Sequence, residues 1–394
     1  MRNEAAPRGI AILLATLSAI GPFSIDTYLP AFPSIARSLG ASQIEVQQTL
    51  TAYLLSFAFM TLWHGALADA LGRRRVILAG LACYTLASLF CLFATRIELL
   101  WLGRVLQGLS AGVGMVVGRA MVRDLFDGAA AQRLMARVGV IFAVAPAIAP
   151  VIGGWVYTFF GWQGIFAFLT LFGAGLWFAC WRALPETLAA DMRQNLHPVA
   201  LWHGYSSVLR SAPFLGLSFA LALNFNGLFI YVLSAPVFLI EHLHLTPQSF
   251  AWLYVPAVAG MMLGNILSAR AAGRFTPHQT ILAGFCLMAL AAAVNIALNL
   301  HHTPGLLQAV LPIGLYDVGM ALAMASLQIL ALDLFPDRRG MASSCQGLLQ
   351  TGTNALTAGV VAPLVWSSTL TLAATMGAFV GLGFIAFLAA RKQR

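Results

Sequence analysis

The chain has 394 residues, of which 60% are hydrophobic and only 9% are charged, and its mean hydropathy is +0.84. Soluble domains carry about 25% charged residues, so this composition excludes a soluble enzyme and predicts that lipid surrounds most of the chain. The formal net charge of +9 would indicate nucleic-acid binding in a soluble protein, but the positions of the basic residues follow membrane topology instead.

Twelve apolar stretches are each long enough to cross about 30 Å of hydrocarbon, for which a helix needs roughly 20 residues. Barrel strands would be about ten residues long with alternating polarity, so we predict helices. The first apolar run is too long for the core of a signal peptide, and we expect it to insert uncleaved. The predicted spans are residues 9–32, 46–68, 75–95, 98–122, 134–158, 161–183, 213–238, 248–270, 278–299, 305–333, 339–362 and 368–390.

One long polar stretch, about residues 185–212, separates the first six spans from the last six. It predicts an N-terminal six-helix bundle over residues 1–184, a central cytoplasmic loop over 185–212 and a C-terminal six-helix bundle over 213–394. ADALGR (Ala68–Arg73), between spans two and three, is matched at four of six positions by ARAAGR (Ala269–Arg274), between spans eight and nine. We therefore expect an all-α integral membrane protein with pseudo-symmetric halves and a binding site between them near the bilayer midplane.

The basic residues lie predominantly on one predicted side of the membrane. With the N-terminus inside, Arg37 and Arg96 are the only basic residues in external loops, Arg104 lies within a span, and the others lie inside. This distribution follows the positive-inside rule. It predicts a multi-pass protein of the cell inner (cytoplasmic) membrane with both termini in the cytoplasm, and it removes the need for a nucleic-acid partner.

A carboxylate and a guanidinium lie within the predicted spans at similar depth. An ionised Asp at a helix centre costs roughly 2.5–3.5 kcal/mol, so such a residue faces a cavity or a partner, or is protonated. Asp26 shares a helical stripe with Ala15, Ala19 and Pro22, which predicts that it faces the protein interior. We expect Asp26 and Arg104 to face one cavity, where Asp26 titrates and a nearby Arg104 lowers its proton affinity. The alternative is a static ion pair that holds two helices together.

Other polar residues at mid-depth are candidate substrate contacts. Asp317, the second intramembrane carboxylate, is a substrate contact, a second proton site, or the acceptor of an interhelical hydrogen bond from Asn or Ser. Asn224 and Tyr231 mark one face of span seven, although polar residues also hold membrane helices together without binding ligands. The candidate substrate-binding residues are Asp26, Tyr53, Asn224, Tyr231, Asp317 and Gln328.

Three motifs in the N-terminal half resemble those of the major facilitator superfamily. GALADALGRRRVIL (Gly65–Leu78) resembles the cytoplasmic signature G-x-L-x-D-R-x-G-R-R, with Ala70 in place of a basic residue. LWLGRVLQGLSAG (Leu100–Gly112) resembles the fourth-helix motif R-x-x-Q-G. APAIAPVIGGW (Ala145–Trp155) resembles the fifth-helix antiporter motif G-P-x-x-G-G, with Ala149 in place of its first glycine. The matching residues are Gly65, Leu67, Asp69, Gly72, Arg73 and Arg74, then Arg104, Gln107 and Gly108, then Pro150, Gly153 and Gly154.

This resemblance covers the whole chain and implies twelve helices in two six-helix bundles. In the family the cytoplasmic signature latches helix ends together, which would make Gly65, Asp69, Gly72 and Arg73 a conformational latch. The alternative is that the arginines only hold this loop on the cytoplasmic side of the membrane. Pro150, Gly153 and Gly154 would form the antiporter-motif helix. IDTYLPAFPSIA in span one and VRDLF (Val122–Phe126) resemble the Bcr/CflA group of multidrug efflux transporters, which implies export of small drugs such as bicyclomycin in exchange for protons.

Together these features predict a proton-coupled secondary transporter, not an enzyme, that works as a monomer by alternating access and exports small-molecule drugs. The alternatives are a proton-coupled uptake symporter for a sugar or organic acid, and a non-transporting membrane sensor. The sequence contains no G-x-x-x-x-G-K-[ST] phosphate loop, so ATP drive within the chain is not expected. No His/Cys cluster has metal-ligand spacing, and we predict no metal and no cofactor.

Overall fold

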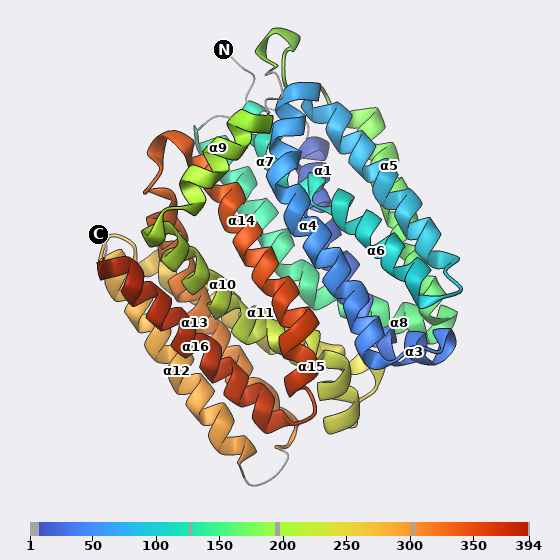
Figure 1. Cartoon of the computed structure of the whole chain (residues 1–394), viewed down its shortest axis with the longest axis vertical. Helices are drawn as coiled ribbons and strands as arrows, with labels where there is room; N and C mark the ends of the chain where they lie inside the picture. Colours follow the sequence, from blue (N-terminus) through green and yellow to red (C-terminus); the bar gives the residue numbers. More distant parts are fainter. Residues whose placement is uncertain (1–7, 126–127, 194–197, 301–303, 393–394) are drawn as a thin grey trace. The chain divides into compact units, whose positions relative to one another are not determined.

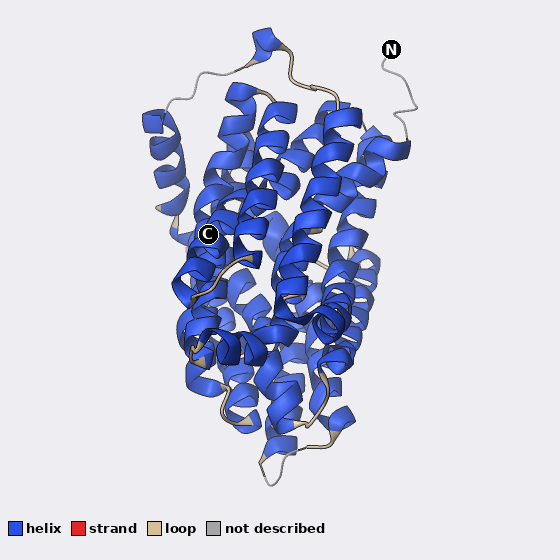
Figure 2. Cartoon of the chain, turned by 90° about the vertical axis from the view of Figure 1, so that its right-hand side faces the viewer, coloured by secondary structure: helices blue, strands red, loops and turns tan. Residues whose placement is uncertain are grey.

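The structure, a computed structural model, describes residues 8–125, 128–193, 198–300 and 304–392. These residues are almost entirely helical (Figure 2), and eleven of their helices are long and apolar enough to cross a membrane. The chain forms two compact units, Met1–His197 and Pro198–Arg394, which we call the N-terminal and C-terminal units. The polar stretch around 185–212 contains the 3₁₀-helix Ala190–Met192 and the helix α9, Pro198–Leu209. Residues 1–7 and 393–394, which carry the predicted cytoplasmic termini, lie outside the described residues.

The first predicted span, residues 9–32, is interrupted twice and extends further than expected. Each α-helical segment ends four residues before a proline: Ser18 precedes Pro22, and Asp26 precedes Pro30. Proline has no backbone N–H, so the carbonyl groups of Ser18 and Asp26 lose their helical donors. The segments are α1 (Arg8–Ser18), α2 (Ile20–Asp26), a 3₁₀ turn (Leu29–Ala31) and α3 (Phe32–Leu39).

The rest of the N-terminal unit, coloured blue to green in Figure 1, consists of five long helices. These are α4 (Gln43–Leu71), α5 (Arg73–Leu92), α6 (Ile97–Ala111), α7 (Val113–Leu125) and α8 (Gly128–Ala183).

Helix α8 accounts for the difference between twelve predicted spans and eleven helices. Its 56 residues would extend about 84 Å at 1.5 Å per residue, far more than one crossing requires. The chain is broken at Gly161, whose φ of 70° and ψ of −175° are non-helical and which lies in a region that glycine adopts without steric cost. The two arms of α8 on either side of Gly161 correspond to the predicted spans 134–158 and 161–183, so the two crossings are joined without a loop.

The C-terminal unit contains the remaining long helices, coloured green to red in Figure 1. A π-helical segment, Pro236–His242, follows the first long helix of the unit, and another, Thr357–Val361, follows α14. The α-helices are α10 (Ala212–Leu233), α11 (Ala251–Ala271), α12 (Pro277–Asn299), α13 (Leu306–Leu332), α14 (Arg339–Leu356), α15 (Ala362–Val365) and α16 (Thr369–Lys392).

The two units repeat one packing scheme. In the N-terminal unit α4 packs against α6, and α5 packs against both α6 and α8; in the C-terminal unit α11 packs against α13, and α12 packs against both α13 and α16. The first span packs on α8, and its counterpart α10 packs on α14 and α16. This matching order of contacts supports the expected pseudo-symmetry of two six-helix bundles.

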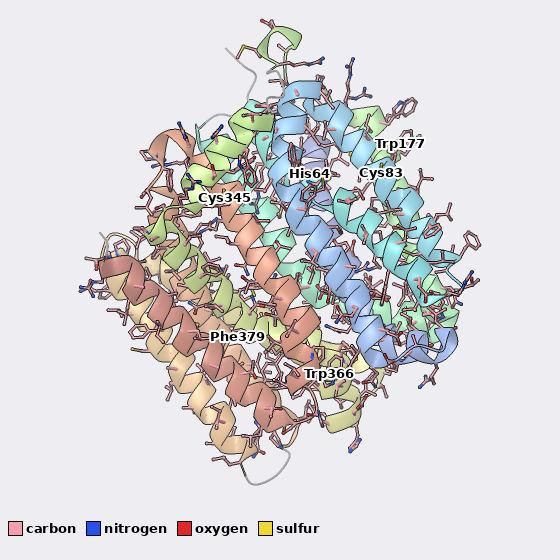
Figure 3. All side chains as sticks on the ribbon, in the orientation of Figure 1. His64, Cys83, Trp177, Cys345, Trp366 and Phe379 are labelled. Carbon is pink, nitrogen blue, oxygen red and sulfur yellow. The ribbon has the colours of Figure 1, made fainter. Side chains whose placement is uncertain are left out.

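Large apolar side chains project from the helices over much of the described surface (Figure 3). Phe93, Phe160, Leu171 and Leu364 are each more than 70% exposed. A soluble protein rarely exposes such contiguous apolar surface, and here it is the surface that contacts lipid.

Candidate functional site

The polar centre of the N-terminal unit is built around Arg104 of α6, whose side chain is completely buried. Its guanidinium carbon lies 4.8 Å from the ring centroid of Tyr28 and 4.4 Å from that of Tyr53. Nη1 donates to the backbone carbonyl of Ser24 at 3.1 Å and to Oε1 of Gln107 at 2.7 Å. We call these five residues the Arg104 cage. Two aromatic faces and two oxygens stabilise a cation that has left water.

A ring of hydrogen bonds connects the cage to α5. Gln107 Nε2 donates to Ser88 Oγ at 2.7 Å, and Ser88 Oγ donates to the backbone carbonyl of Tyr84 at 2.8 Å. The hydroxyl groups of Tyr84 and Ser24 then lie 2.6 Å apart, which returns the path to the residue that binds Arg104. This ring fixes α2, α5 and α6 to one another at the depth of Arg104.

Asp26 lies two residues after Ser24, at the last position of α2, and is 5% exposed. Ala15, Ala19 and Pro22, which share its stripe, are buried too, as the sequence predicted for this face. Tyr53 lies within electrostatic range of both Asp26 and Arg104. The predicted neighbours Asp26 and Arg104 are therefore brought to the same region, with Tyr53 beside both.

The Arg104 guanidinium keeps hydrogen-bonding capacity beyond the contacts of the cage. Its Nε and Nη2 are buried without a hydrogen-bond partner in the described structure. The static Asp26–Arg104 ion pair, the alternative left open by the sequence, stays a prediction. Two donor nitrogens of a buried cation thus remain able to bind an anion or water.

Two motif glycines let helices approach the cage closely. A Cβ atom on Gly108 would collide with the backbone carbonyl of Tyr53, and one on Gly153 would collide with the backbone of Thr27. Gly108 thereby allows α4 to place the Tyr53 ring over Arg104. Gly153, on α8, packs against the residue that directly follows Asp26. The neighbouring motif residues Pro150 and Gly154 are buried on the same helix.

In the C-terminal unit the predicted residues do not form one cluster. Asp317 lies in the middle of α13, is completely buried, and neither of its oxygens accepts a hydrogen bond from a described residue. Gln328, predicted on the same stripe, is exposed; it is eleven residues further on, about 16 Å along the helix. The interhelical hydrogen bond to Asn or Ser, one alternative for Asp317, is not made by the described side chains.

The two predicted residues of α10 differ: Tyr231 makes a side-chain hydrogen bond, whereas Nδ2 and Oδ1 of the buried Asn224 have no hydrogen-bond partner in the described structure. Tyr231 accepts a hydrogen bond from Asn295 Nδ2 of α12 at 2.8 Å. The buried Asn224 faces α16, because a Cβ on Gly383 would lie 2.6 Å from Asn224 Oδ1, and its backbone carbonyl accepts from the Tyr316 hydroxyl at 2.7 Å. Tyr231 thus has a helix-joining contact in this structure.

An amide cluster that the sequence analysis did not single out joins α10 to α14. Asn226 Nδ2 donates to Asn354 Oδ1 at 2.9 Å, and Gln350 Nε2 donates to the same oxygen at 3.2 Å. Asn226 lies two residues from Asn224, on a different face of α10. The spacing of Gln350 and Asn354, four residues apart on α14, was the available signal for this cluster.

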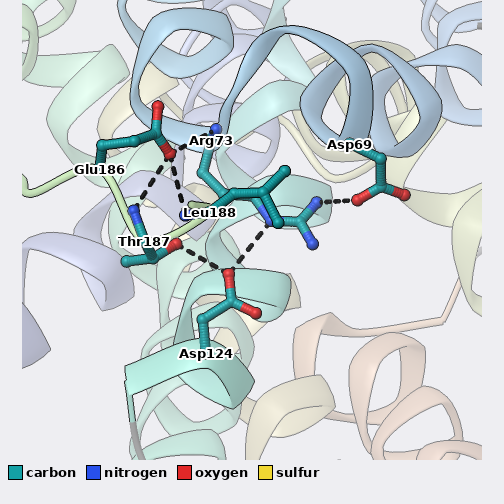
Figure 4. A network of polar contacts seen from close by, with 6 residues as sticks. All are labelled: Asp69, Arg73, Asp124, Glu186, Thr187 and Leu188. Carbon is teal, nitrogen blue, oxygen red and sulfur yellow. Dashed lines mark hydrogen bonds and ion pairs between the residues drawn. The ribbon is translucent and has the colours of Figure 1, made fainter. Parts of the chain in front are cut away.

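Two of the predicted latch residues, Asp69 and Arg73, lie in a separate polar network where α4 ends and α5 begins (Figure 4). Arg73, the first residue of α5, pairs with Asp69 of α4 and, at 3.2 Å, with Asp124 of α7. Gly65 has looser packing, since a Cβ there would lie 4.0 Å from Val116.

Gly72 joins α4 to α5 and gives the network its backbone geometry. Its φ of 101° is a left-handed conformation that favours glycine. Glu186, from the segment after α8, accepts from the backbone N–H of Arg73 at 2.9 Å, and Asp124 also accepts from Thr187 Oγ1 at 2.7 Å. The network therefore ties four chain segments together; Asp124 and Glu186 were not predicted, although VRDLF contains the former.

No group of three or more His, Cys, Asp or Glu side chains among the described residues has the arrangement of a metal site. The polar centres instead offer a buried cation, a nearby carboxylate, an isolated carboxylate and neutral amides. Such a set can exchange protons and form hydrogen bonds with a ligand inside an apolar bundle.

The profile of the Major Facilitator Superfamily matches residues 13–358. The chain belongs to this superfamily. The bacterial homolog of the human lysosomal transporter Spinster, solved in an inward-facing and unoccupied conformation, has a similar fold, with a TM-score of 0.73 at 16% identity over 98% of each chain. At that identity the likeness supports the fold alone, which is the predicted one.

Three curated relatives match most of this superfamily member. The uncharacterized MFS-type transporter YdgK of Bacillus subtilis is 32% identical over 98% of this chain and 96% of its own. The bicyclomycin resistance protein homolog of Haemophilus influenzae is 28% identical over 95% and 94%, respectively. The multidrug resistance protein MdtL of Escherichia coli O139:H28 is 30% identical over 84% and 82%.

Proposed function

We propose that this superfamily member is a Bcr/CflA-type transporter of the bacterial cytoplasmic membrane that exports drugs or similar small molecules in exchange for protons. The names of two relatives, a bicyclomycin resistance protein homolog and a multidrug resistance protein, support drug export. The observation that carries proton coupling is the buried Asp26 beside the Arg104 cage. The protein works as a monomer, with both termini in the cytoplasm.

Asp26 is the residue that takes up and releases the coupling proton. A carboxylate at this depth is stable when it is neutral or when a cation is close. Arg104 has two unsatisfied donor nitrogens and is anchored two residues away through Ser24. A small movement of α2 brings the Asp26 carboxylate to these donors and favours its ionised form; movement away favours proton uptake.

Glycine packing lets the rest of the bundle respond to that movement. Gly153 of α8 lies against the backbone of Thr27, directly after Asp26. A shift at the end of α2 is therefore passed to α8, the helix that carries the antiporter motif. The network of Asp69, Gly72 and Arg73, with Gly65 nearby, holds α4, α5 and α7 together at one end and acts as the latch.

Alternating access then exchanges one drug molecule for protons. Protonation of Asp26 from the outside displaces the drug, and deprotonation inside allows the next drug molecule to bind. Tyr53 borders Asp26 in the N-terminal unit, and Asn224, Tyr231 and Gln328 are the proposed drug contacts of the C-terminal unit. One charge moving down about 100 mV yields roughly 2.3 kcal/mol, which at 1.4 kcal/mol per decade supports a drug gradient of about fiftyfold.

The direct test is uphill transport by the purified protein in proteoliposomes. We expect an imposed proton gradient to drive drug accumulation with the wild type and to fail with Asp26→Asn, which cannot ionise. Asp333→Asn is the matched control, because Asp333 is an exposed carboxylate paired with Arg339 and should leave accumulation unchanged.

Because Asn mimics the protonated state of Asp26 that displaces the drug, drug binding by Asp26→Asn should be weaker than by the wild type and should no longer depend on the protonation of residue 26. Retained proton-driven accumulation in that variant would remove Asp26 from coupling. Accumulation of a sugar or organic acid down the proton gradient, without drug export, would instead identify an uptake symporter.

A further inference from the structure

The proposed cycle leaves the electrostatics of Asp317 unexplained. Asp317 lies eleven residues after the start of α13 and fifteen before its end, so it is near the midpoint of that span. Its side chain is completely buried, and both oxygens lack a hydrogen-bond partner among the described residues. An ionised carboxylate in that position would lose its hydration without gaining any compensating contact.

Close helix packing keeps water away from Asp317. A Cβ on Gly260 of α11 would lie 3.1 Å from the Cβ of Asp317 and would collide with the carbonyl oxygen of Gly314. One turn further along α11, a Cβ on Gly264 would collide with the carbonyl oxygen of Val318. The two backbones thus touch on either side of the carboxyl group, in the manner of small-xxx-small membrane contacts.

The helices that pack against α13 place no cation beside Asp317. These helices are α10, α11, α12 and α14, and their basic side chains lie only in first or last turns, away from the middle of α13. Tyr316, the adjacent residue on α13, has its hydroxyl bonded to the Asn224 carbonyl. The charged or titratable side chains on the four packed helices are Tyr231, Tyr254, Arg270, His278, Cys286, Arg339 and Cys345.

We propose that Asp317 is a second proton-carrying site, which holds its proton while α11 and α13 are in contact and releases it when that contact opens to water. On closing, a carboxylate oxygen of Asp317 binds one H⁺ and the neutral acid is buried; on opening, the O–H bond breaks and the proton passes to water. The protonated state of Asp317 is inferred from its burial and its lack of hydrogen-bond partners, and does not depend on the proposed function. The role in transport rests on the proposed function, which it extends from one coupling proton to two.

The protonation state is tested by infrared spectroscopy of the full-length protein in lipid at neutral pH. Protonated carboxylic acids give a carbonyl band that carboxylates lack, so the wild type should show a band that is missing from Asp317→Asn. Asp333→Asn should retain this band, because Asp333 is exposed and ion-paired at the end of the same helix. Equal spectra for the wild type and Asp317→Asn would show an ionised Asp317 and overturn the proposal, whether or not the protein exports drugs.

The transport role is tested by counting protons moved per drug molecule in proteoliposomes. We expect Asp317→Asn to move one proton fewer than the wild type, or to lose uphill transport while drug counterflow continues. The Asn side chain matches the neutral acid in size and charge, so the variant should melt at the same temperature as the wild type. An unchanged proton count, or loss of both uphill transport and counterflow in a variant with the wild-type melting temperature, would overturn the proposal.

Discussion

The fourth membrane-spanning segment of each unit carries one completely buried acidic or basic residue, and the surroundings of the two residues are opposite. Arg104 of α6 lies under the Tyr53 ring of α4 and donates to Ser24 and Gln107. Asp317 of α13 lies against Gly260 of α11 and has no hydrogen-bond partner among the described residues. Because α4–α6 and α11–α13 are corresponding helix pairs, corresponding helices hold a hydrogen-bonded cation in one unit and an acid without hydrogen-bond partners in the other.

This difference indicates that the buried charge of the N-terminal unit is constant, whereas that of the C-terminal unit changes with its surroundings. A caged cation remains charged throughout, and so supplies a constant field in which Asp26 can titrate. A carboxyl group without partners is stable only with its proton, so its charge must change if its surroundings open. The buried side-chain contacts Asn226–Asn354 and Tyr231–Asn295 of the C-terminal unit are between neutral groups.

The largest effect should come from Arg104→Lys, which keeps the charge but loses the planar fork. A lysine ammonium cannot stack on both tyrosines while bonding to Ser24 and Gln107. Loss of one hydrogen bond to a charged group costs about 1.5–3 kcal/mol, so we expect proton-driven export to fall by roughly tenfold to a hundredfold. Initial transport rates in proteoliposomes measure this, with Arg37→Lys as the surface control; equal rates in both variants would show that the cage geometry is irrelevant.

The next effect should come from the contact between α8 and the end of α2. Gly153→Ala places a methyl group on the Thr27 backbone, whereas Gly175→Ala, on the same helix, meets nothing within 4 Å. We expect Gly153→Ala to lower the melting temperature by several degrees and to reduce export, as overpacking costs about 1–3 kcal/mol. Gly175→Ala should be neutral or slightly stabilising, and similar melting curves for the two variants would contradict this account.

A smaller effect should distinguish two tyrosines, one from each polar centre. Tyr231→Phe leaves the buried Asn295 donor without its present acceptor, which costs about 1–3 kcal/mol of unfolding free energy. Tyr53→Phe keeps the ring over Arg104 and removes a hydroxyl that makes no hydrogen bond with good geometry, so its melting temperature should change little. A lower melting temperature for Tyr53→Phe than for Tyr231→Phe would contradict the view that the Tyr53 ring stabilises Arg104 while the Tyr231 hydroxyl joins two helices.

The smallest effect should come from the two turns with similar sequences, Ala68–Arg73 and Ala269–Arg274. Gly72 and Gly273 both have positive φ, but Asp69 of the first turn is replaced by Arg270 in the second. Asp124→Asn removes a partly exposed ion pair with Arg73, which is worth about 0.2–1 kcal/mol. We expect a slightly lower melting temperature at low salt and convergence with the wild type at high salt; Arg274→Gln, at the second turn, should show no such salt dependence.

The sequence was sufficient for the class of fold because apolar run length and charge placement act locally. The motif glycines also indicated close helix contacts, and Gly108 and Gly153 make them. The interruptions of the first span were readable from Pro22 and Pro30, yet a hydropathy window averages across them. Gly161 could not be recognised as a junction without a loop, because the backbone φ of a glycine is set by the helices that meet there.

The site was harder to derive because its contacts join distant parts of the chain. Asp26 and Arg104 were matched by depth, but the cage depends on Tyr28 as well as on the predicted Tyr53. Gln328 was placed with Asp317 by helical periodicity, which does not report where neighbouring helices end. Asp124 of α7 and Glu186 of the segment after α8 are 51 and 113 residues away from Arg73 in the sequence, so only the folded chain brings them to it.

The central claim is that Asp26 binds the proton that drug displaces. Its most direct test is the release of protons when drug is added to the detergent-purified protein in a weakly buffered solution, compared between the wild type and Asp26→Asn at equal drug occupancy. We predict release from the wild type and a loss of about one proton per bound drug in Asp26→Asn. Equal release from the two proteins would contradict the account.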